Sequence, residues 1–223
     1  MKVAIVHDYI KEYGGAERVL EKLHEVFPDA PIFTTVYLPS FLGPHKKRFE
    51  GMDIKTSFLQ FFPFKSKLIS PFRLLASMAF GSFDLSAFDV IIVSQTGSYF
   101  PNAVKKRKAK LICYCHTPPR YLYGFETARD WKKNKFFMVL GMISIHFLRI
   151  IDFKSSQNVD YFIANSENVK KRIQKFYRKD AVVIYPPVVI SQENNEMQKQ
   201  SYYLAGGRLA RPKHVDLIVE TFS

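Results

Sequence analysis

The sequence predicts an α/β fold with a doubly wound parallel sheet. Short apolar runs rich in Val, Ile and aromatic residues recur along the chain, and segments with helical apolar spacing lie between them. Because these runs are apolar almost without interruption, their strands are expected to be buried on both faces, as in a parallel sheet. The 21 Phe and 12 Tyr among the 223 residues supply ample material for a core. Strands that alternate with helices in this way form a sheet covered by helices.

Six strands are expected, each bounded by turn residues. They span residues 3–7, 32–37, 90–93, 111–115, 161–164 and 181–185. Open α/β sheets bind their ligands at the carboxyl ends of the strands. The loops that follow these strands are therefore the places to search for a site.

Two amphipathic helices are expected from apolar residues spaced three and four apart. The first ends at Pro28, and the second begins after Ser166, which is placed to cap it. Their apolar stripes consist of Val19, Leu20, Leu23, Val26 and Phe27, and of Val169, Ile173, Phe176 and Tyr177. A third segment, 136–151, contains His146 and Arg149 and falls short of the roughly 20 residues that cross a bilayer. It is expected to be a core or surface helix.

The chain is expected to contain one domain over residues 1–190, a polar linker over 191–200, and the beginning of a second domain over 201–223. The second unit would consist of a strand at 202–205 and a helix at 215–222. A lone strand and helix cannot form a core, and nothing further in the sequence would cover the apolar face of that helix. The second domain is therefore expected to be incomplete.

The net charge is strongly positive, with 33 Lys and Arg against 20 Asp and Glu, or +13. Such a charge attracts nucleic acid, anionic lipid or phosphorylated small molecules. Nucleic acid is not expected as a partner, because no nucleic-acid-binding motif is present and the charge is spread over separate segments. The basic segments are 46–48, 105–110, 132–133 and 170–179.

Residues 58–80 interleave aromatic side chains with Lys65, Lys67 and Arg73. Basic residues beside exposed apolar ones favour attachment to an anionic membrane surface. The alternative is a pair of helices that covers the core, with the charges in solvent. The sequence leaves both interpretations open.

Cys113 and Cys115 are expected to be buried free thiols, since their spacing suits neither a zinc pair nor a redox CxxC motif. The sequence shows no cluster of metal ligands, so no metal site is expected. No signal peptide is expected before the first strand, because no long apolar segment leads into it. A cytoplasmic location, with peripheral binding at the inner face of the cell membrane, is the corresponding expectation.

Three loops carry candidate site residues. Gly14 and Gly15 lead from the first strand into the first helix, where they form either a plain tight turn or an anion site at the helix N-terminus. His116 directly follows the strand at 111–115, where a histidine can exchange a proton or bind a sugar hydroxyl, or play a structural role. Arg208 and Lys213 flank the turn before the last helix, as a diphosphate cradle or as a solvated basic turn.

These segments together resemble the retaining glycosyltransferases of family 4, whose GT-B fold has two facing Rossmann-like domains. Five motifs carry the resemblance, in the expected order and each on its strand-to-helix turn. They are HDYIKEYGGAERVLEKL at 7–23, ICYCHTPPRYLYG at 112–124, YFIANSENVKKRIQKFY at 161–177, VVIYPPV at 182–188 and GGRLARPKHVDLIVETF at 206–222. The His-Thr-Pro-x-Arg-Tyr motif is similar to that of mannosyltransferase-type enzymes of surface polysaccharide and O-antigen assembly.

The resemblance implies a role for each candidate residue. Gly14 and Gly15 would face the donor phosphate, and His116 would lie beside the transferred sugar in the active-site cleft. Arg208 and Lys213 would bind the donor diphosphate, without a metal or other cofactor. Arg120 and Tyr121 would lie on the acceptor side, although the family usually continues Leu-Trp-Asp where this chain has Leu122-Tyr123-Gly124.

The activity implied is transfer of a sugar, mannose in the most similar subgroup, from a nucleotide-sugar donor to a glycan or lipid-linked acceptor. Residues 1–190 would be the acceptor-side domain. The family's second domain carries a Glu-x7-Glu motif that residues 201–223 lack, so the 223-residue chain is expected to have little or no activity alone. The alternative is a non-catalytic sugar- or lipid-binding half-enzyme that depends on a partner.

Overall fold

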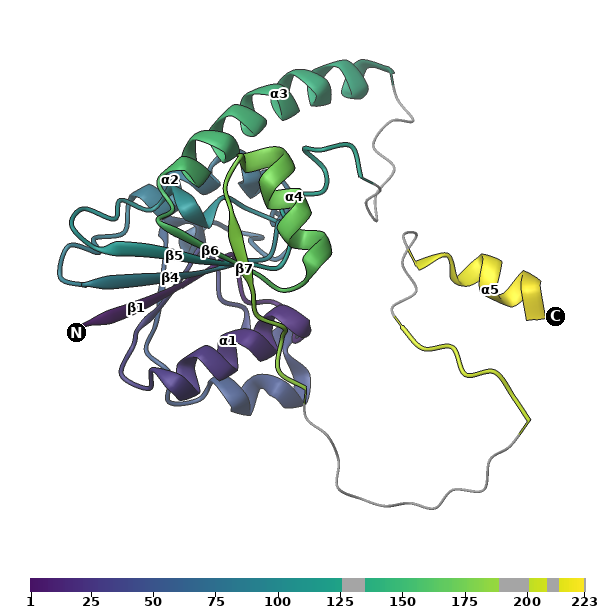
Figure 1. Cartoon of the computed structure of the whole chain (residues 1–223), viewed down its shortest axis with the longest axis horizontal. Coiled ribbons are helices and arrows are strands. Elements are labelled where there is room, and N and C mark those ends of the chain that lie inside the picture. The colour runs from purple at the N-terminus through teal and green to yellow at the C-terminus, as the bar shows by residue number, and fades with distance from the viewer. Residues whose placement is uncertain (126–134, 189–200, 208–212, 223) are drawn as a thin grey trace.

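The computed structural model describes residues 1–125, 135–188, 201–207 and 213–222, with side chains of 135–140 left out. Its core is a seven-stranded sheet in which every neighbouring pair is parallel, in the order β3-β2-β1-β4-β5-β6-β7 (Figure 1). The strands are β1 Val3–His7, β2 Ile32–Thr34, β3 Ile54–Thr56, β4 Val90–Gln95, β5 Lys110–Cys115, β6 Tyr161–Ala164 and β7 Ala181–Val183. The strand order reverses between β1 and β4, which is the topological switch point where such sheets bind ligands. The doubly wound α/β prediction is confirmed.

The six predicted strands all form; those at 3–7 and 161–164 have the predicted bounds, and the other four have changed ends. The one expected at 32–37 stops at Thr34, and beyond it Tyr37 forms only an isolated bridge with Ile10. The strand missed from the sequence is β3, Ile54–Thr56, which lies at the sheet edge and has no buried residue. A three-residue edge strand with a central lysine carries no apolar run, so its pairing with β2 depends on the tertiary structure.

Helices cover both faces of the sheet. The helices that do so are α1 Gly15–Val26, α2 Ala76–Gly81, α3 Lys135–Gln157 and α4 Glu167–Tyr177; a further helix, α5, spans Val215–Phe222. Helix α1 lies on one face, and α2, α3 and α4 lie on the other (Figure 1). Short 3-10 turns occur at Pro39–Phe41, Gly43–Phe49, Phe58–Phe61, Pro71–Leu74 and Pro101–Ala103. The predicted cap of α4 is confirmed, since the Ser166 hydroxyl accepts the Val169 N–H at 3.3 Å.

The core consists of two clusters, one on each face of the sheet. Successive residues of β1 alternate between them: Ala4 and Val6 belong to the larger cluster, and Ile5 packs with Leu20 of α1 in the smaller one. Alternation of side chains along a strand requires this division. Both cysteines are buried and unpaired, as predicted.

Segments 136–151 and 58–80 were considered above as possible membrane-associated segments, and the structure shows how both fold. None of the helices in the described part of the chain has the length and apolar character needed to cross a bilayer. Segment 58–80 folds into 3-10 turns and α2 rather than a pair of regular helices. Its Phe72 and Phe80 are buried in the core, but Phe61 and Phe64 are 84% and 77% exposed.

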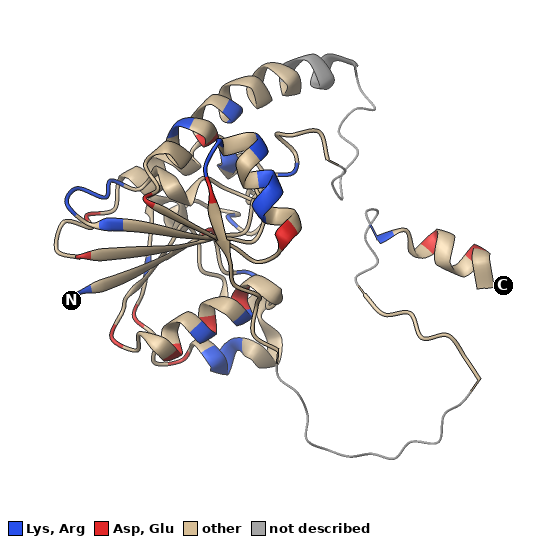
Figure 2. Cartoon of the chain, viewed as in Figure 1, with Lys and Arg blue, Asp and Glu red and all other residues tan. Residues whose placement is uncertain are grey.

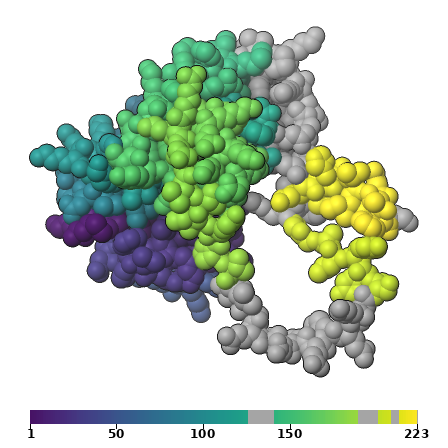
Figure 3. Space-filling model, viewed as in Figure 1, coloured from purple at the N-terminus to yellow at the C-terminus, as the bar shows by residue number. Residues whose placement is uncertain are grey.

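Residues 201–207 have no regular secondary structure, so the strand expected at 202–205 does not form. A strand needs a neighbouring strand to pair its backbone groups, and none of the described residues lies beside this segment in a sheet. Helix α5 forms as expected, with no buried residue. The space-filling view shows α5 in yellow and the sheet domain in purple to green (Figure 3).

Candidate active site

A cavity of about 300 Å³ opens at the carboxyl edge of the central strands. It lies where β1, β4, β5 and β6 end, at the switch point of the sheet. The lining residues come from the loops after these strands, from the start of α1 and from the segment after β7. They are Tyr9, Glu12, Gly14, Gly15, Ala16, Glu17, Thr96, Ser98, His116, Asn165 and Pro186.

The N-terminus of α1 forms one wall of this cavity. Gly14 is the N-cap residue, and its N–H donates to Glu17 Oε2 at 2.8 Å, which closes the first turn. The N–H groups of Gly15 and Ala16 have no partner among the described residues, and both residues line the cavity. Free amides and the positive end of the helix dipole suit a negatively charged group.

A buried chain of hydrogen bonds runs behind the cavity wall. The Ser94 hydroxyl lies 3.1 Å from His7 Nδ1 and 3.1 Å from His116 Nε2, and thus joins the two rings. On its other side, His7 Nε2 faces Glu17 Oε1 at 3.6 Å. We refer to His7, Ser94 and His116 as the His7–Ser94–His116 network.

The protonation of two groups in this region follows from burial. Burial lowers the pKa of His116 to about 4, with a further lowering by His7 and an opposing effect of Glu17. His116 is therefore a neutral ring at neutral pH. Burial opposes ionisation of Glu17, but the contact with His7 and the hydrogen bond from the Gly14 N–H outweigh it, so the Glu17 pKa is lowered.

Asp8 holds the loop after β4 in place. Its fully buried carboxylate accepts hydrogen bonds from the Thr96 hydroxyl and, at 3.0 and 3.2 Å, from the backbone N–H groups of Ser98 and Tyr99. Burial raises the Asp8 pKa, against the lowering effect of His7 and these bonds. Thr96 and Ser98 thereby present their side of the loop to the cavity.

The loops after β4 and β5 touch at Gly97. Its φ is +83°, and a Cβ added there would lie 2.7 Å from the Thr117 carbonyl oxygen. Only glycine meets both conditions without strain. The contact sets the position of the loop that carries His116.

Comparison with known proteins now decides the family. The model of Glycosyltransferase Family 4 matches residues 13–192, well over half of the chain. The chain belongs to glycosyltransferase family 4. No curated protein matches this sequence.

Solved structures that match include Anabaena HepE (Alr3699) in complex with UDP, at 13% sequence identity and a TM-score of 0.48. The match covers 84% of this chain and 44% of HepE. The family 4 chain therefore spans less than half of the length of that protein.

Of the residues singled out from the sequence of this family 4 chain, the structure brings three together. Gly14, Gly15 and His116 line one cavity, although they lie about a hundred residues apart in sequence. Lys213 is exposed just before α5 and does not line this cavity. Arg208 lies outside the described residues.

Arg120 and Tyr121 take different positions. Arg120 is exposed and lines neither of the two cavities at this edge of the sheet. The Tyr121 hydroxyl donates to the Ser98 carbonyl at 3.4 Å, and the Arg73 guanidinium lies 4.4 Å from its ring centre. Tyr121 therefore supports the cavity loop from behind.

Sequence reasoning missed Glu17, Ser94 and Asp8 as parts of this site. A signal was present, because Ser94 is a polar residue that ends the apolar run of β4, and Asp8 stands directly after β1. Glu17 stands three residues after Gly14, which is the spacing of a capping box. Only the tertiary structure shows that Glu17 also faces His7.

A second cavity of about 560 Å³ adjoins the first one and shares Tyr9 and Glu12 with it. Its remaining lining is Lys11, Phe41, Ser66, Lys67, Ile69 and Ser70. The Lys11 ammonium donates to the Ser66 carbonyl at 2.8 Å and lies 5.0 Å from the centre of the Phe41 ring. Two ammonium groups and two aromatic rings thus surround this space.

A buried polar cluster joins the sheet to α3 and α4. Asp152 of α3 accepts hydrogen bonds from the hydroxyls of Tyr123 at 2.8 Å and Tyr177 at 3.2 Å. Tyr177 in turn accepts a bond at 3.0 Å from the side chain of Gln95, at the end of β4. Burial raises the Asp152 pKa to about 7, a rise that the two tyrosine hydrogen bonds reduce.

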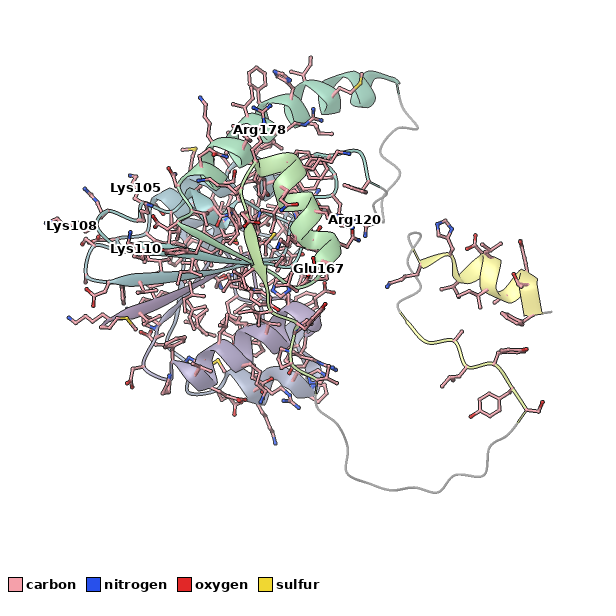
Figure 4. The ribbon with its side chains drawn as sticks, viewed as in Figure 1. Lys105, Lys108, Lys110, Arg120, Glu167 and Arg178 are labelled. Atoms are coloured by element: carbon pink, nitrogen blue, oxygen red, sulfur yellow. The ribbon has the colours of Figure 1, made fainter. Side chains whose placement is uncertain are left out.

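The strongest basic run of the chain lies away from the cavity. Lys105, Lys108 and Lys110 are grouped at the amino end of β5, and Arg120 marks the opposite edge (Figure 4). Lys106 there pairs with Asp160 at 2.8 Å. The remaining Lys and Arg are scattered over several helices and loops (Figure 2). Within the described ranges, no three His, Cys, Asp or Glu side chains are arranged to hold a metal ion.

Proposed function

We propose that this chain forms the acceptor-side domain of a GT-B glycosyltransferase that moves a sugar from a nucleotide-sugar donor to a glycan or lipid-linked acceptor. The observation that supports it is the first cavity. It combines the open N-terminus of α1 with a neutral, half-buried histidine at the switch point of a family 4 sheet.

The reaction requires stabilisation of negative charge as the bond between the sugar and the diphosphate breaks. In the proposal, the N–H groups of Gly15 and Ala16 face the donor phosphate, while His116 contacts the transferred sugar. Arg208 and Lys213 bind the diphosphate from the second domain, and no metal takes part. Fixed dipoles and cations at a leaving group are generally a large catalytic contribution.

The second cavity is proposed to hold the acceptor. It shares Tyr9 and Glu12 with the first cavity, so an acceptor bound there would lie beside the sugar. Lys11 and Lys67 favour an acceptor that carries a phosphate or another anionic group. Replacement of Lys11 by Ala is expected to raise the KM for the acceptor and leave the KM for the donor unchanged.

Peripheral attachment to the inner face of the cell membrane is proposed from segment 58–80. Exposed Phe61 and Phe64 stand beside Lys65 and Lys67, near the second cavity. Aromatic side chains that enter the headgroup region and lysines that attract anionic lipid act together in such binding. This location would bring a lipid-linked acceptor to the second cavity.

Sugar transfer is best tested with the protein as its source produces it. UDP- and GDP-sugars, GDP-mannose among them, are incubated with a lipid-diphosphate glycan acceptor, and the anomeric configuration of the product is read by NMR. A retained configuration and a loss of kcat of about 100-fold in His116→Asn are expected. His146→Asn, on the exposed part of α3, is the matched control with normal activity. Full activity of His116→Asn would refute the role of this cavity.

Membrane binding is tested by flotation with neutral and anionic vesicles at low and high salt. The chain is expected to bind anionic vesicles, and salt is expected to weaken this binding. Phe61→Ser with Phe64→Ser should reduce it, whereas Val26→Ser, at an exposed apolar site on α1, should not. Equal binding to neutral vesicles would remove the electrostatic part of the proposal.

A further inference from the structure

The direction of every hydrogen bond in the His7–Ser94–His116 network is set by Glu17. The Glu17 carboxylate repels the lone pair of a bare nitrogen 3.6 Å away, so the ring nitrogen of His7 that faces it, Nε2, is the one that carries a hydrogen. In a His7 ring with one hydrogen, Nδ1 must then accept. The hydroxyl of Ser94 therefore donates to His7 Nδ1.

The same reasoning extends to His116. Because the Ser94 hydrogen points to His7, the Ser94 oxygen can only accept from His116, whose Nε2 must carry the hydrogen. The remaining ring nitrogen, Nδ1, is then a bare acceptor. It has no hydrogen-bond partner among the described residues, and His116 lines the cavity. Which ring nitrogen of His116 is bare thus depends on the Glu17 carboxylate at the start of α1.

We propose that Glu17, His7 and Ser94 are positioning residues that hold His116 in the tautomer with its hydrogen on Nε2, so that Nδ1 accepts a hydrogen bond from a substrate hydroxyl. A ring in this state selects a hydroxyl group over a phosphate oxygen, which has no hydrogen to give. That the hydroxyl belongs to a sugar rests on the proposed function; the tautomer itself does not. His7 and Ser94 are fully buried, so water does not compete for the hydrogen bond between them.

The capping contact of Glu17 provides a direct test. Glu17 Oε2 accepts the Gly14 N–H, so in Glu17→Gln the amide oxygen must take that place and the amide NH2 must turn toward His7. Glutamine serves in a capping box as well as glutamate does. His7 Nε2 would now accept, His7 Nδ1 would donate to Ser94, and Ser94 would donate to His116 Nε2. The hydrogen of His116 would therefore move to Nδ1, with no change in side-chain size.

The measurement is the NMR spectrum of the 223-residue chain with nitrogen-15-labelled histidine at neutral pH, which separates bare from hydrogen-carrying ring nitrogens. His116→Asn identifies the His116 signals. The hydrogen of His116 is expected on Nε2 in the native chain and in Ser94→Thr, and on Nδ1 in Glu17→Gln. In Ser94→Ala the link is cut, so adding Glu17→Gln should change nothing further at His116.

Two outcomes would overturn the proposal: a hydrogen on His116 Nδ1 in the native chain, or an unchanged His116 tautomer in Glu17→Gln. The catalytic readout is kcat for sugar transfer by the protein from its source, expected to fall at least about 10-fold in Glu17→Gln and to stay normal in His146→Asn, on the exposed part of α3. If the tautomer changes as expected but no sugar is transferred, the proposed function fails and the assignment of the positioning residues stands.

Discussion

At the scale of single residues, the site depends on side chains whose chemistry is altered by burial. His116 remains neutral because burial lowers its pKa to about 4. Asp8 uses its carboxylate to hold two backbone N–H groups of the loop after β4. Gly97 lets that loop approach the loop of His116 more closely than any other residue would allow. Each of these residues acts by fixing the position of its neighbours.

Gly97→Ala is expected to lower the free energy of unfolding by about 1 to 3 kcal/mol, because it combines a positive φ with a Cβ 2.7 Å from a backbone oxygen. Gly51→Ala is the matched control, since Gly51 has a φ of +85° with no atom within 4 Å of the added Cβ. Urea unfolding of the two variants measures the difference. An equal loss of unfolding free energy in both variants would mean that the backbone near Thr117 shifts to make room for the added Cβ without an energetic cost.

At the scale of elements, capping contacts fix where the helices begin and end. Glu17 closes the first turn of α1 on Gly14, and Ser166 caps α4. The other end of α4 is less favourable, because Arg178 adopts the left-handed conformation at φ +55° while its N–H bonds the Gln174 carbonyl. Glycine is the usual residue at this position, since it has no Cβ to oppose that conformation.

Arg178→Gly is therefore expected to raise the free energy of unfolding by about 1 kcal/mol. Arg178 is exposed and marks the end of α4 in the side-chain view (Figure 4), so few contacts are lost with the side chain. Arg178→Ala removes the side chain but keeps the Cβ, and should give no such gain. Urea unfolding compares the three chains. A gain of equal size in Arg178→Ala would point to the arginine charge instead of the backbone.

At the scale of the whole molecule, a buried carboxylate links the sheet to α3 and α4. Asp152 connects Tyr123, before α3, with Tyr177, at the end of α4. Burial raises its pKa from 3.8 to about 7 in the folded chain. The folded state thus holds a proton that the unfolded state releases between about pH 4 and pH 7. Asp152 therefore contributes stability that is fully present below pH 4 and is lost as the pH rises through 7.

Asp152→Asn should remove this dependence. Between pH 5 and pH 6, the stability of the native chain relative to the variant is expected to fall by about 1.4 kcal/mol per pH unit, and the fall levels off above pH 7. Asp160→Asn is the control, because hydrogen bonding and nearby lysines lower the Asp160 pKa despite some desolvation, so its contribution is constant in this range. Chemical unfolding at several pH values provides the test. A constant difference between native chain and Asp152→Asn would show that Asp152 is ionised throughout.

The fold could be predicted from the sequence to a large extent. The apolar runs from β1 to β7 mark six of the seven strands, and helices α1, α4 and α5 follow from their stripes. What could not be predicted is β3, whose Lys55 interrupts any apolar pattern, and the irregular course of residues 201–207. Both depend on whether a neighbouring strand is available, which local sequence does not encode.

The sequence by itself determined the fold class, the family motifs and the loops in which a site would be found, because these depend on local apolar spacing and on turn residues. Tertiary structure alone decided which of those loops meet. It placed Gly14, Gly15 and His116 around one cavity, left Arg120 outside it, and set Glu17 against His7. The physical reason is that parallel strands distant in sequence end at one edge of the sheet, where burial and hydrogen bonding across strands set the charge and the hydrogen positions of the site.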